Sequence, residues 1–269
     1  MPDRYAVIGH PVAHSFSPLI HGAFARETGQ DMEYVRVLAP LDAFVVTVEK
    51  FRREGGRGAN VTLPFKEEAF RLASRHTQRA SAAGAVNTLR FEAQDCLGDN
   101  TDGVGLVRDL RDNLGRAIAA ARILLVGAGG AARGVILPLL DEAPRELVIA
   151  NRTAARAVAL AQLFGRSVEA SGFAALIGRQ FDIVINATSA SLAGEAPTLP
   201  RGLYAGGALA YDLMYGKGET PFLQQASDEG ARVADGLGML VEQAAESFYL
   251  WRGVRPATRP VLDELRRAL

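Results

Sequence analysis

A turn of small residues follows the apolar run Ile123–Val126, and it reads Gly127, Ala128, Gly129, Gly130, Ala131 and Ala132. This spacing fits G-x-G-x-x-A, in which the first glycine makes a tight turn and the second lets a pyrophosphate approach the backbone. The last small residue allows the following helix to pack closely on the strand. Because the free N–H groups and the dipole at a helix start favour negative charge, the turn predicts a dinucleotide site.

Two arginines follow the next predicted strand, Glu146–Ala150. The sequence there is Asn151, Arg152, Thr153, with Arg156 four residues after Arg152. An NAD site usually has a carboxylate at this point, whereas guanidinium groups bind a 2′-phosphate. The alternative, two solvated arginines, is less natural because cations are disfavoured at a helix start. The pattern favours NADP.

Lys66 is also a cation predicted at the start of a helix, where positive charge is unfavourable. Pro64 ends a predicted strand, Ala59–Leu63, and a helical pattern covers Phe65–Ala73, so Lys66 falls in the first helical turn. A helix start disfavours an ammonium ion, which suits a lysine that transfers protons. The alternative is a lysine on a solvated helix face.

Three further polar residues have a structural and a functional interpretation. Ser17 precedes Pro18 and fits a helix N-cap, yet Ser15 and Ser17 together suit a small hydroxylated or anionic ligand. Asp102 likewise fits the N-cap of a helix marked by Val107 and Leu110. An N-cap carboxylate can still face a cleft, so both interpretations of Asp102 stay open.

The elements that must position these residues predict an α/β fold with two domains. Short strands and helices alternate from Tyr5 onward, and Val86–Phe91 looks like an edge strand interrupted by Asn87. A turn-rich segment, Leu97–Gly103, marks a first hinge and Gly236–Gly238 a second. We therefore expect an α/β substrate domain over residues 1–102, completed by C-terminal helices over 238–269. A Rossmann-type NADP-binding domain, residues 103–237, is inserted between them.

Composition excludes several classes of protein. The chain has 269 residues, of which 48% are hydrophobic, with 30 basic and 30 acidic side chains. This balance argues against nucleic-acid binding. One cysteine, Cys96, cannot form an intrachain disulfide or a cysteine metal cluster, and the four histidines lack a ligand spacing, so we expect no metal. The chain shows no signal peptide or membrane span, which predicts a cytoplasmic protein.

Several separate motifs, in order along the whole chain, resemble shikimate dehydrogenase. They are His14–Pro18, Asn60–Lys66, Gly84–Thr88, Asn100–Gly103, Gly127–Ala132, Asn151–Thr153, Asn186–Ser189 and Asp235–Met239 with Gln243. The NVTLPFK and NTDG motifs are the more specific ones. This sequence departs from the family at Ala59, often a cysteine there, and in the loop after Ser189, which lacks the usual glycines.

The resemblance implies hydride exchange between NADP and the ring carbon that bears one hydroxyl of shikimate, giving 3-dehydroshikimate. It implies that Lys66 is the acid/base and that Asp102 binds the same hydroxyl. Ser15 and Ser17 would bind the substrate carboxylate, and the ring hydroxyls would contact Thr62, Asn87, Tyr215 and Gln243. Besides the glycine turn and Asn151, Arg152, Thr153 and Arg156, the cofactor would contact Thr188, Met214 and Gly236.

Other functions remain as alternatives. A quinate/shikimate dehydrogenase of broader specificity is the nearest, although Arg152 without a carboxylate argues against NAD. A non-catalytic sensor of NADP or a polyhydroxy acid would not need Lys66 and Asp102 together. A methyltransferase would have no use for the paired arginines. Monomer and homodimer are both open.

Overall fold

The computed structural model describes residues 1–188, 190–216 and 218–269, so Ser189 of the motif Asn186–Ser189 lies outside the described residues. The chain divides into two compact units. Unit 1 comprises Met1–Gly105 and Val241–Leu265, and unit 2 comprises Leu106–Leu240 and Arg266–Leu269. The last four residues belong to unit 2, although the sequence places them with the C-terminal helices of the substrate domain. The predicted α/β fold class is confirmed.

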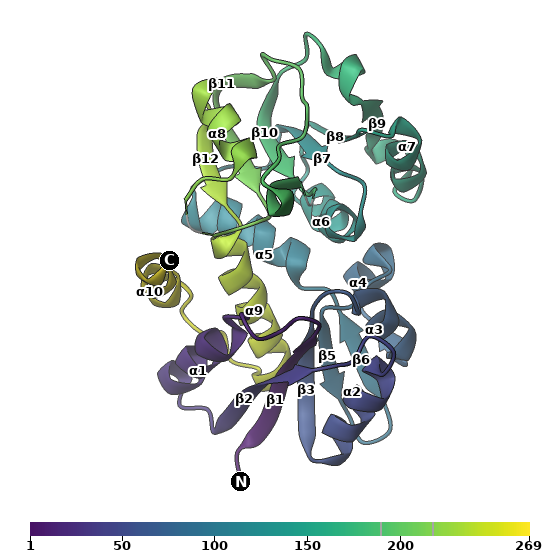
Figure 1. The fold of residues 1–269 in the computed structure, drawn as a ribbon, viewed down its shortest axis with the longest axis vertical. Coiled ribbons are helices and arrows are strands. Elements are labelled where there is room, and N and C mark those ends of the chain that lie inside the picture. The colour runs from purple at the N-terminus through teal and green to yellow at the C-terminus, as the bar shows by residue number, and fades with distance from the viewer. Residues whose placement is uncertain (189, 217) are drawn as a thin grey trace. The chain divides into compact units, whose positions relative to one another are not determined.

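Unit 1 is built on a mixed sheet of six strands in the order β2-β1-β3-β5-β6-β4 (Figure 1). Its strands are β1 (Asp3–Gly9), β2 (Met32–Leu38), β3 (Gly56–Val61), β4 (Arg75–His76), β5 (Thr88–Phe91) and β6 (Cys96–Asp99). Its helices are α1 (Ser17–Thr28), α2 (Phe44–Arg53), α3 (Lys66–Leu72), α4 (Gln78–Ala83) and the start of α5 (Asp102–Arg108). The helices α9 (Leu237–Arg252) and α10 (Arg259–Ala268) supply its C-terminal part.

Alternation along β1 divides the side chains of unit 1 between the two faces of the sheet. Ala6 and Ile8 pack with Phe44 of α2 in one apolar cluster. On the other face Tyr5 stacks on Trp251 of α9, with ring centroids 4.7 Å apart. Helices therefore cover both faces, which explains why β1 has five consecutive buried residues.

Unit 2 contains a six-stranded parallel sheet in the order β12-β11-β10-β7-β8-β9 (Figure 1). Its strands are β7 (Arg122–Val126), β8 (Glu146–Asn151), β9 (Glu169–Gly172), β10 (Phe181–Asn186), β11 (Tyr204–Asp212) and β12 (Arg232–Asp235). Its α-helices are α6 (Gly130–Asp141), α7 (Ala154–Gln162) and α8 (Pro221–Asp228), with short turns η1 (Asp109–Asn113, a π-helix), η2 (Gly165–Ser167), η3 (Phe173–Leu176) and η4 (Ala190–Ala193). This is the doubly wound order of a Rossmann fold.

One strand assignment and the start of one hinge, both made from the sequence, are wrong. β5 lies between β3 and β6, antiparallel to both, so the predicted edge strand Val86–Phe91 is an interior strand. The predicted hinge Leu97–Gly103 begins inside β6, whose four residues Cys96–Asp99 are all buried. Gly98 belongs to that strand because β5 and β4 pair with it on its two edges. A short segment with glycine and aspartate looks like a turn until its neighbours are known.

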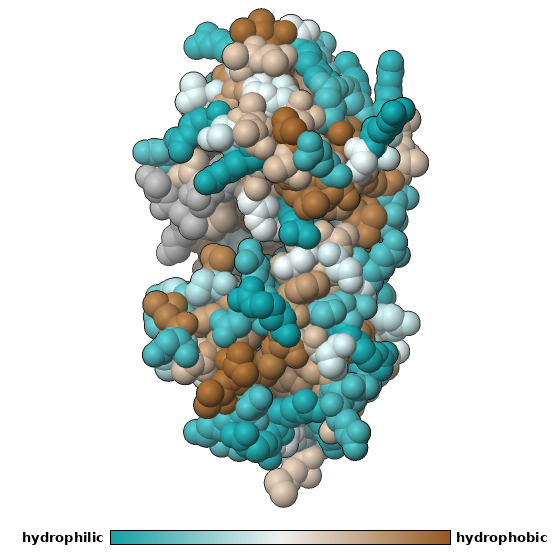
Figure 2. All heavy atoms as spheres, turned by 90° about the vertical axis from the view of Figure 1, so that its right-hand side faces the viewer, coloured by the Kyte–Doolittle hydropathy of each residue, from teal (hydrophilic) through white to brown (hydrophobic). Residues whose placement is uncertain are grey.

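Some apolar side chains remain at the surface. Leu38, Leu41, Val46 and Leu63 of unit 1 are 60–66% exposed. In Figure 2, hydrophobic residues gather in patches that hydrophilic residues surround.

Within the described residues, no helix is both long enough and apolar enough to cross a bilayer.

The N-terminal half of α1 contains a buried histidine. His21 is fully buried, and its ring stacks on that of Tyr34 with centroids 4.2 Å apart. Among the described residues, neither ring nitrogen has a hydrogen-bond partner of standard geometry. Burial lowers the pKa of His21 to about 3, and the Asn60 side chain opposes this with a smaller effect. His21 is therefore neutral in the folded protein at neutral pH.

This neutral histidine predicts a specific loss of stability in acid. The unfolded chain binds a proton at His21 below about pH 6.5, but the folded chain does so only near pH 3. Stability is thus fully present above the unfolded pKa and falls as the pH drops between these values. From pH 7 to pH 5 the free energy of unfolding should fall about 2 kcal/mol more in the wild type than in His21→Phe. Denaturant titrations at both pH values measure it; parallel losses in the two proteins would contradict it.

Candidate active site

Lys66 and Asp102 form an ion pair in unit 1, although 36 positions separate them in the chain. Lys66 Nζ donates to Asp102 Oδ2 at 2.6 Å. Lys66 is the first residue of α3 and Asp102 the first residue of α5. The two side chains are 31% and 16% exposed, so the pair is partly shielded yet reachable by a small molecule. A lysine that can give up a proton beside a carboxylate suits acid–base chemistry.

Asn87 holds the other oxygen of that carboxylate. Its Nδ2 donates to Asp102 Oδ1 at 2.8 Å, while its Oδ1 accepts the backbone N–H of Thr101 at 2.9 Å. A backbone N–H can only donate, so this bond determines which way the amide of Asn87 points. Gln243 Oε1 lies 3.3 Å from the same Nδ2. The structure therefore brings together four of the predicted site residues, Lys66, Asn87, Asp102 and Gln243.

The N-cap interpretation holds for neither Ser17 nor Asp102. Asp102 is the first residue of α5, and its carboxylate oxygens accept hydrogen bonds from Lys66 and Asn87. Ser17 is likewise the first residue of α1, and the preceding residue, Phe16, provides no side-chain cap. The hydroxyl of Ser15 instead accepts the Ser17 N–H at 3.2 Å. The Ser15 hydroxyl therefore satisfies a backbone N–H at the start of α1, and the Ser17 hydroxyl is not needed as a cap.

Ser15 and Ser17 lie together where β1 leads into α1. The Ser15 hydroxyl donates to the Ser17 hydroxyl, with 3.1 Å between the two oxygens. Thr62 follows the adjacent strand β3, and its N–H donates to Ile8 O of β1 at 3.0 Å. A Cβ on Gly9 would stand 2.3 Å from Thr62 Cγ2, so glycine is required at position 9 for this approach. The carboxyl ends of two neighbouring parallel strands thus carry all three hydroxyls.

A buried polar layer that sequence reasoning missed supports this group. Asn60 Nδ2 lies 2.9 Å from Ser247 Oγ and 3.0 Å from Thr88 Oγ1, and donates to both. The Tyr34 hydroxyl donates to Asn60 Oδ1 at 2.7 Å, and burial raises the pKa of Tyr34 well above its usual value. The Ser247 hydroxyl also donates to Gln243 O. One signal was available: Ser247 follows Gln243 by four residues and shares its helix face.

Removing the Asn87 amide tests how much the site depends on it. Asn87→Ala leaves the buried Thr101 N–H without its acceptor and Asp102 Oδ1 without a donor. We expect the free energy of unfolding to fall by about 1–3 kcal/mol, the usual cost of an unsatisfied buried polar group. Denaturant unfolding measures this loss. Unchanged stability would show that another group replaces the amide.

The glycine turn of unit 2 has the geometry that a bound pyrophosphate needs. Gly127 has φ of 112°, and a Cβ there would lie 3.1 Å from Ala187 O, so only glycine fits. Gly129 precedes α6 and Gly130 begins it, and a Cβ on either would meet nothing within 4 Å. The backbone there is open to a ligand. The turn follows β7, which neighbours β10 at the point where the strand order reverses, where dinucleotides bind in this fold.

The start of α7 is open to an anion in the same unit. Thr153 precedes the helix without a side-chain capping bond, and the first turn contains no acidic residue. Arg152 and Arg156 are exposed, and within the described part of the chain neither has a carboxylate within 4.0 Å. Asn151 Nδ2 donates to Thr153 O at 3.0 Å. Two unpaired cations at an uncapped helix start fit a phosphate group.

A buried amide, Asn186, and a buried carboxylate, Asp212, hydrogen-bond to two of the remaining predicted cofactor-binding residues. Asn186 Oδ1 accepts from the N–H and the hydroxyl of Thr188 at 3.1 and 2.7 Å. Asp212 Oδ1 accepts from Met214 N at 3.1 Å. A Cβ on Gly236 would stand 2.3 Å from Leu213 O, so the chain passes too closely for another residue. Tyr215 also belongs to unit 2, and burial raises its pKa.

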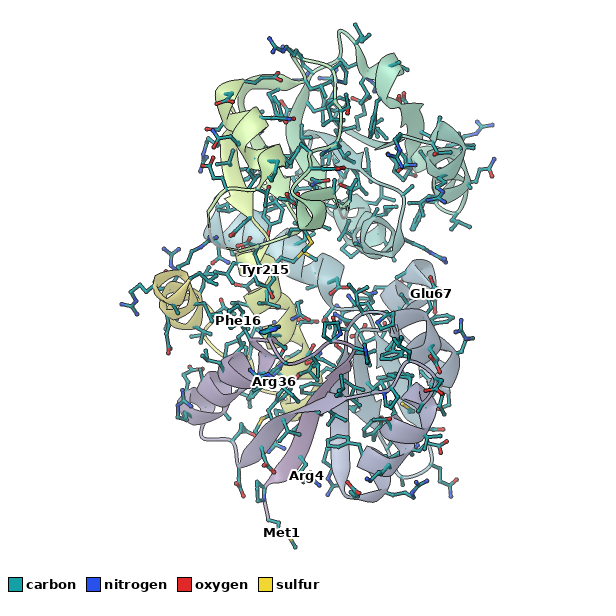
Figure 3. All side chains as sticks on the ribbon, in the orientation of Figure 1. Met1, Arg4, Phe16, Arg36, Glu67 and Tyr215 are labelled. Carbon is teal, nitrogen blue, oxygen red and sulfur yellow. The ribbon has the colours of Figure 1, made fainter. Side chains whose placement is uncertain are left out.

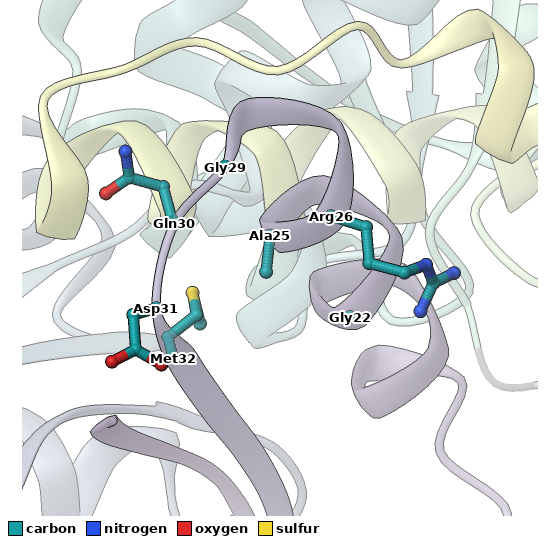
Figure 4. A pocket seen from close by; sticks show the side chains of 7 residues that line it. All are labelled: Gly22, Ala25, Arg26, Gly29, Gln30, Asp31 and Met32. Carbon is teal, nitrogen blue, oxygen red and sulfur yellow. The ribbon is translucent and has the colours of Figure 1, made fainter. Parts of the chain in front are cut away.

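A hollow at the end of α1 is lined by Gly22, Ala25, Arg26, Gly29, Gln30, Asp31 and Met32 (Figure 4). It contains none of the predicted residues, and the Arg26 side chain points away from Asp31. Nor do three or more potential metal ligands come together anywhere in the described ranges.

Comparison with known proteins places both units in one family. Three family models match: "Shikimate dehydrogenase substrate binding domain" over residues 7–89, "Shikimate / quinate 5-dehydrogenase" over 109–193, and "Shikimate 5'-dehydrogenase C-terminal domain" over 236–266. A shikimate dehydrogenase (NADP(+)) of Nitrosospira multiformis is 63% identical, covering 100% of this chain and 99% of the relative.

Solved structures agree over nearly the whole chain. An Ael1 enzyme from Pseudomonas putida has a TM-score of 0.93 at 53% identity, covering 98% of both chains. A shikimate 5-dehydrogenase from Thermus thermophilus, in complex with NADP(H) and shikimate, has a TM-score of 0.89 at 35% identity. That match covers 99% of this chain and 100% of the other.

Proposed function

This chain belongs to the shikimate dehydrogenase family, and we propose that it works through Lys66, Asp102 and Asn87. It is an NADP-dependent oxidoreductase that interconverts shikimate and 3-dehydroshikimate, a reaction of aromatic amino acid biosynthesis. The observation that carries the assignment of residues is the Lys66–Asp102 pair, with each carboxylate oxygen held by its own donor.

NADP supplies the hydride acceptor or donor when it is bound. As shikimate is oxidised, a C–H bond breaks with its electron pair and the hydroxyl on the same carbon must lose its proton. Lys66 takes that proton as a neutral amine and becomes an ammonium ion, and in reverse the ammonium ion protonates the carbonyl oxygen and returns to the amine. Asp102 accepts a hydrogen bond from the same hydroxyl and balances the charge of Lys66, while Asn87 keeps the carboxylate in place.

The other assignments rest on placement within each unit. Ser15 and Ser17 bind the substrate carboxylate through their adjacent hydroxyls, and Thr62, Gln243 and Tyr215 bind ring hydroxyls. The glycine turn Gly127–Ala131 binds the pyrophosphate, and Arg152 and Arg156 bind the 2′-phosphate with Asn151 and Thr153. Thr188, Met214 and Gly236 line the remainder of the cofactor site. The backbone open at Gly129 and Gly130 supports this division of roles.

An absorbance assay tests the proposal. Purified protein is mixed with NADP⁺ and shikimate, and formation of NADPH is followed, with NAD⁺ and quinate in parallel wells. Rapid reduction with NADP⁺ and shikimate alone supports the function as stated. Equal turnover of quinate indicates the broader specificity named in the matching family model. NADPH binding without turnover of either acid supports a sensor instead.

We further propose that the two functional domains meet at residues 102/103 and 237/238, and that the enzyme is cytoplasmic and either a monomer or a homodimer. Light scattering at several concentrations distinguishes the two states, and cell fractionation locates the protein.

A further inference from the structure

Arg36 ties strand β2 to the loop that carries Ser15 and Ser17. Its Nε and Nη2 both donate to the backbone oxygen of Ser15, at 3.1 and 2.6 Å. Figure 3 shows Arg36 close to Phe16, the residue between the two serines. The same loop is held at its start by His10, whose N–H donates to Leu63 O at 2.9 Å. The charged side chain of Arg36 is thus bonded directly to the backbone carbonyl of Ser15.

The charge of Arg36 is not neutralised nearby. Through the described ranges it has no carboxylate within 4.0 Å, and the first turn of α1 contains no acidic residue. Its Nη1 donates to none of the described residues, so a planar guanidinium with unused donors is bonded to the backbone of Ser15. Most other exposed arginines of unit 1, such as Arg57 with Asp3, are paired with an acid.

We propose that Arg36 makes this site select a substrate that carries a carboxylate. The proposal rests on the proposed function, in which Ser15 and Ser17 bind that group. Neutral hydroxyls alone cannot distinguish a carboxylate from its ester or amide, because they bond to either. An unpaired guanidinium bonded to the backbone of Ser15 attracts the ionised form more strongly than the neutral one, and its two bonds to Ser15 O also orient the loop. Arg36 is a specificity and positioning residue that leaves the chemistry at Lys66 untouched.

Steady-state kinetics with two substrates separate charge from loop positioning. Shikimate carries the carboxylate, and its methyl ester has the same ring and hydroxyls without the charge. The variants are Arg36→Gln, which loses the charge, and Arg36→Lys, which keeps it but loses the two-pronged bond. Arg57→Gln is the matched control, an exposed arginine on strand β3, which β1 separates from β2. Arg36 pairs with Val7 of β1, and Arg57 falls opposite the register shift of β1 two to three residues earlier.

Arg36→Gln should raise KM for shikimate about three- to tenfold with kcat within about twofold, the size of an electrostatic effect between partly solvated charges. Arg36→Lys should regain most of that loss, and Arg57→Gln should resemble the wild type. KM for the methyl ester should rise much less than KM for shikimate in Arg36→Gln, because the ester senses only the positioning of the loop, and it should be unchanged in Arg57→Gln. Added salt should raise KM for shikimate in the wild type more than in Arg36→Gln.

Three results would overturn the inference. An unchanged KM for shikimate in Arg36→Gln would remove Arg36 from recognition. Equal losses with shikimate and its ester would reduce Arg36 to a support for the loop. A wild-type protein that fails to oxidise shikimate would remove the proposed function itself, which the wild-type measurement shows before any variant is compared.

Discussion

Replacing Lys66 by alanine should lower kcat about 10²- to 10⁴-fold, the usual contribution of a positioned acid or base. KM for shikimate should change far less, because the serine hydroxyls and the amide of Asn87 remain. The loss is large because no second group capable of proton transfer bonds to the Asp102 carboxylate among the described residues: its other oxygen is held by an amide. Initial rates at saturating NADP⁺ measure the effect.

Two further variants show that proton transfer is what Lys66→Ala removes. Lys66→Arg keeps a positive charge next to Asp102 but cannot give up its proton, so it should stay nearly inactive. Lys50→Ala is the matched control, since Lys50 is an exposed lysine of unit 1 that faces Glu54 along α2. It should keep wild-type kcat. If Lys66→Arg instead recovers most of the activity, charge alone is what the reaction needs.

Arg152→Asp should shift the preference of the enzyme from NADP towards NAD. The substitution removes a guanidinium from the open start of α7 and puts a carboxylate in its place, which repels a 2′-phosphate and accepts from ribose hydroxyls. One lost charge-assisted bond corresponds to about 10- to 100-fold in affinity. We expect the ratio of kcat/KM for NADP⁺ to that for NAD⁺ to fall by at least this factor.

Arg166→Asp provides the control for that experiment. Arg166 is an exposed arginine of η2, beyond the C-terminal end of α7. Replacing it by aspartate makes the same change of charge, but at least one helix length, about 13 Å, away from Arg152. Its cofactor preference should match the wild type. An unaltered preference in Arg152→Asp would mean that Arg156 or another group holds the phosphate.

Local patterns predicted the inserted unit well. Ile123–Val126 and Phe181–Asn186 are strands because unbroken apolar runs suit a parallel sheet covered on both faces, and the two faces indeed form separate clusters. Gly127 has the positive φ that its place after a strand implied. Each of these features depends on a few consecutive residues, so sequence reasoning could find it.

The errors arose where neighbours along the chain were poor guides to neighbours in space. β6 looked like a turn because Gly98 and Asp99 are turn formers, yet Asp99 is fully buried and accepts from Arg79 at 2.7 Å. β5 looked like an edge because Asn87 precedes it, yet that amide belongs to the site. Buried polar groups are stable only when bonded, and their partners are far away in the sequence.

The sequence by itself determined the α/β class, the glycine turn, the arginines after β8 and the presence of Lys66 at a helix start, since each is a local property of the chain. Only the tertiary structure decided that Lys66 meets Asp102, that Thr101 orients the amide of Asn87, and that Arg36 holds Ser15. Those contacts depend on which strands lie next to each other and which face each side chain takes. No local pattern encodes that choice, because it follows from the packing of the whole unit.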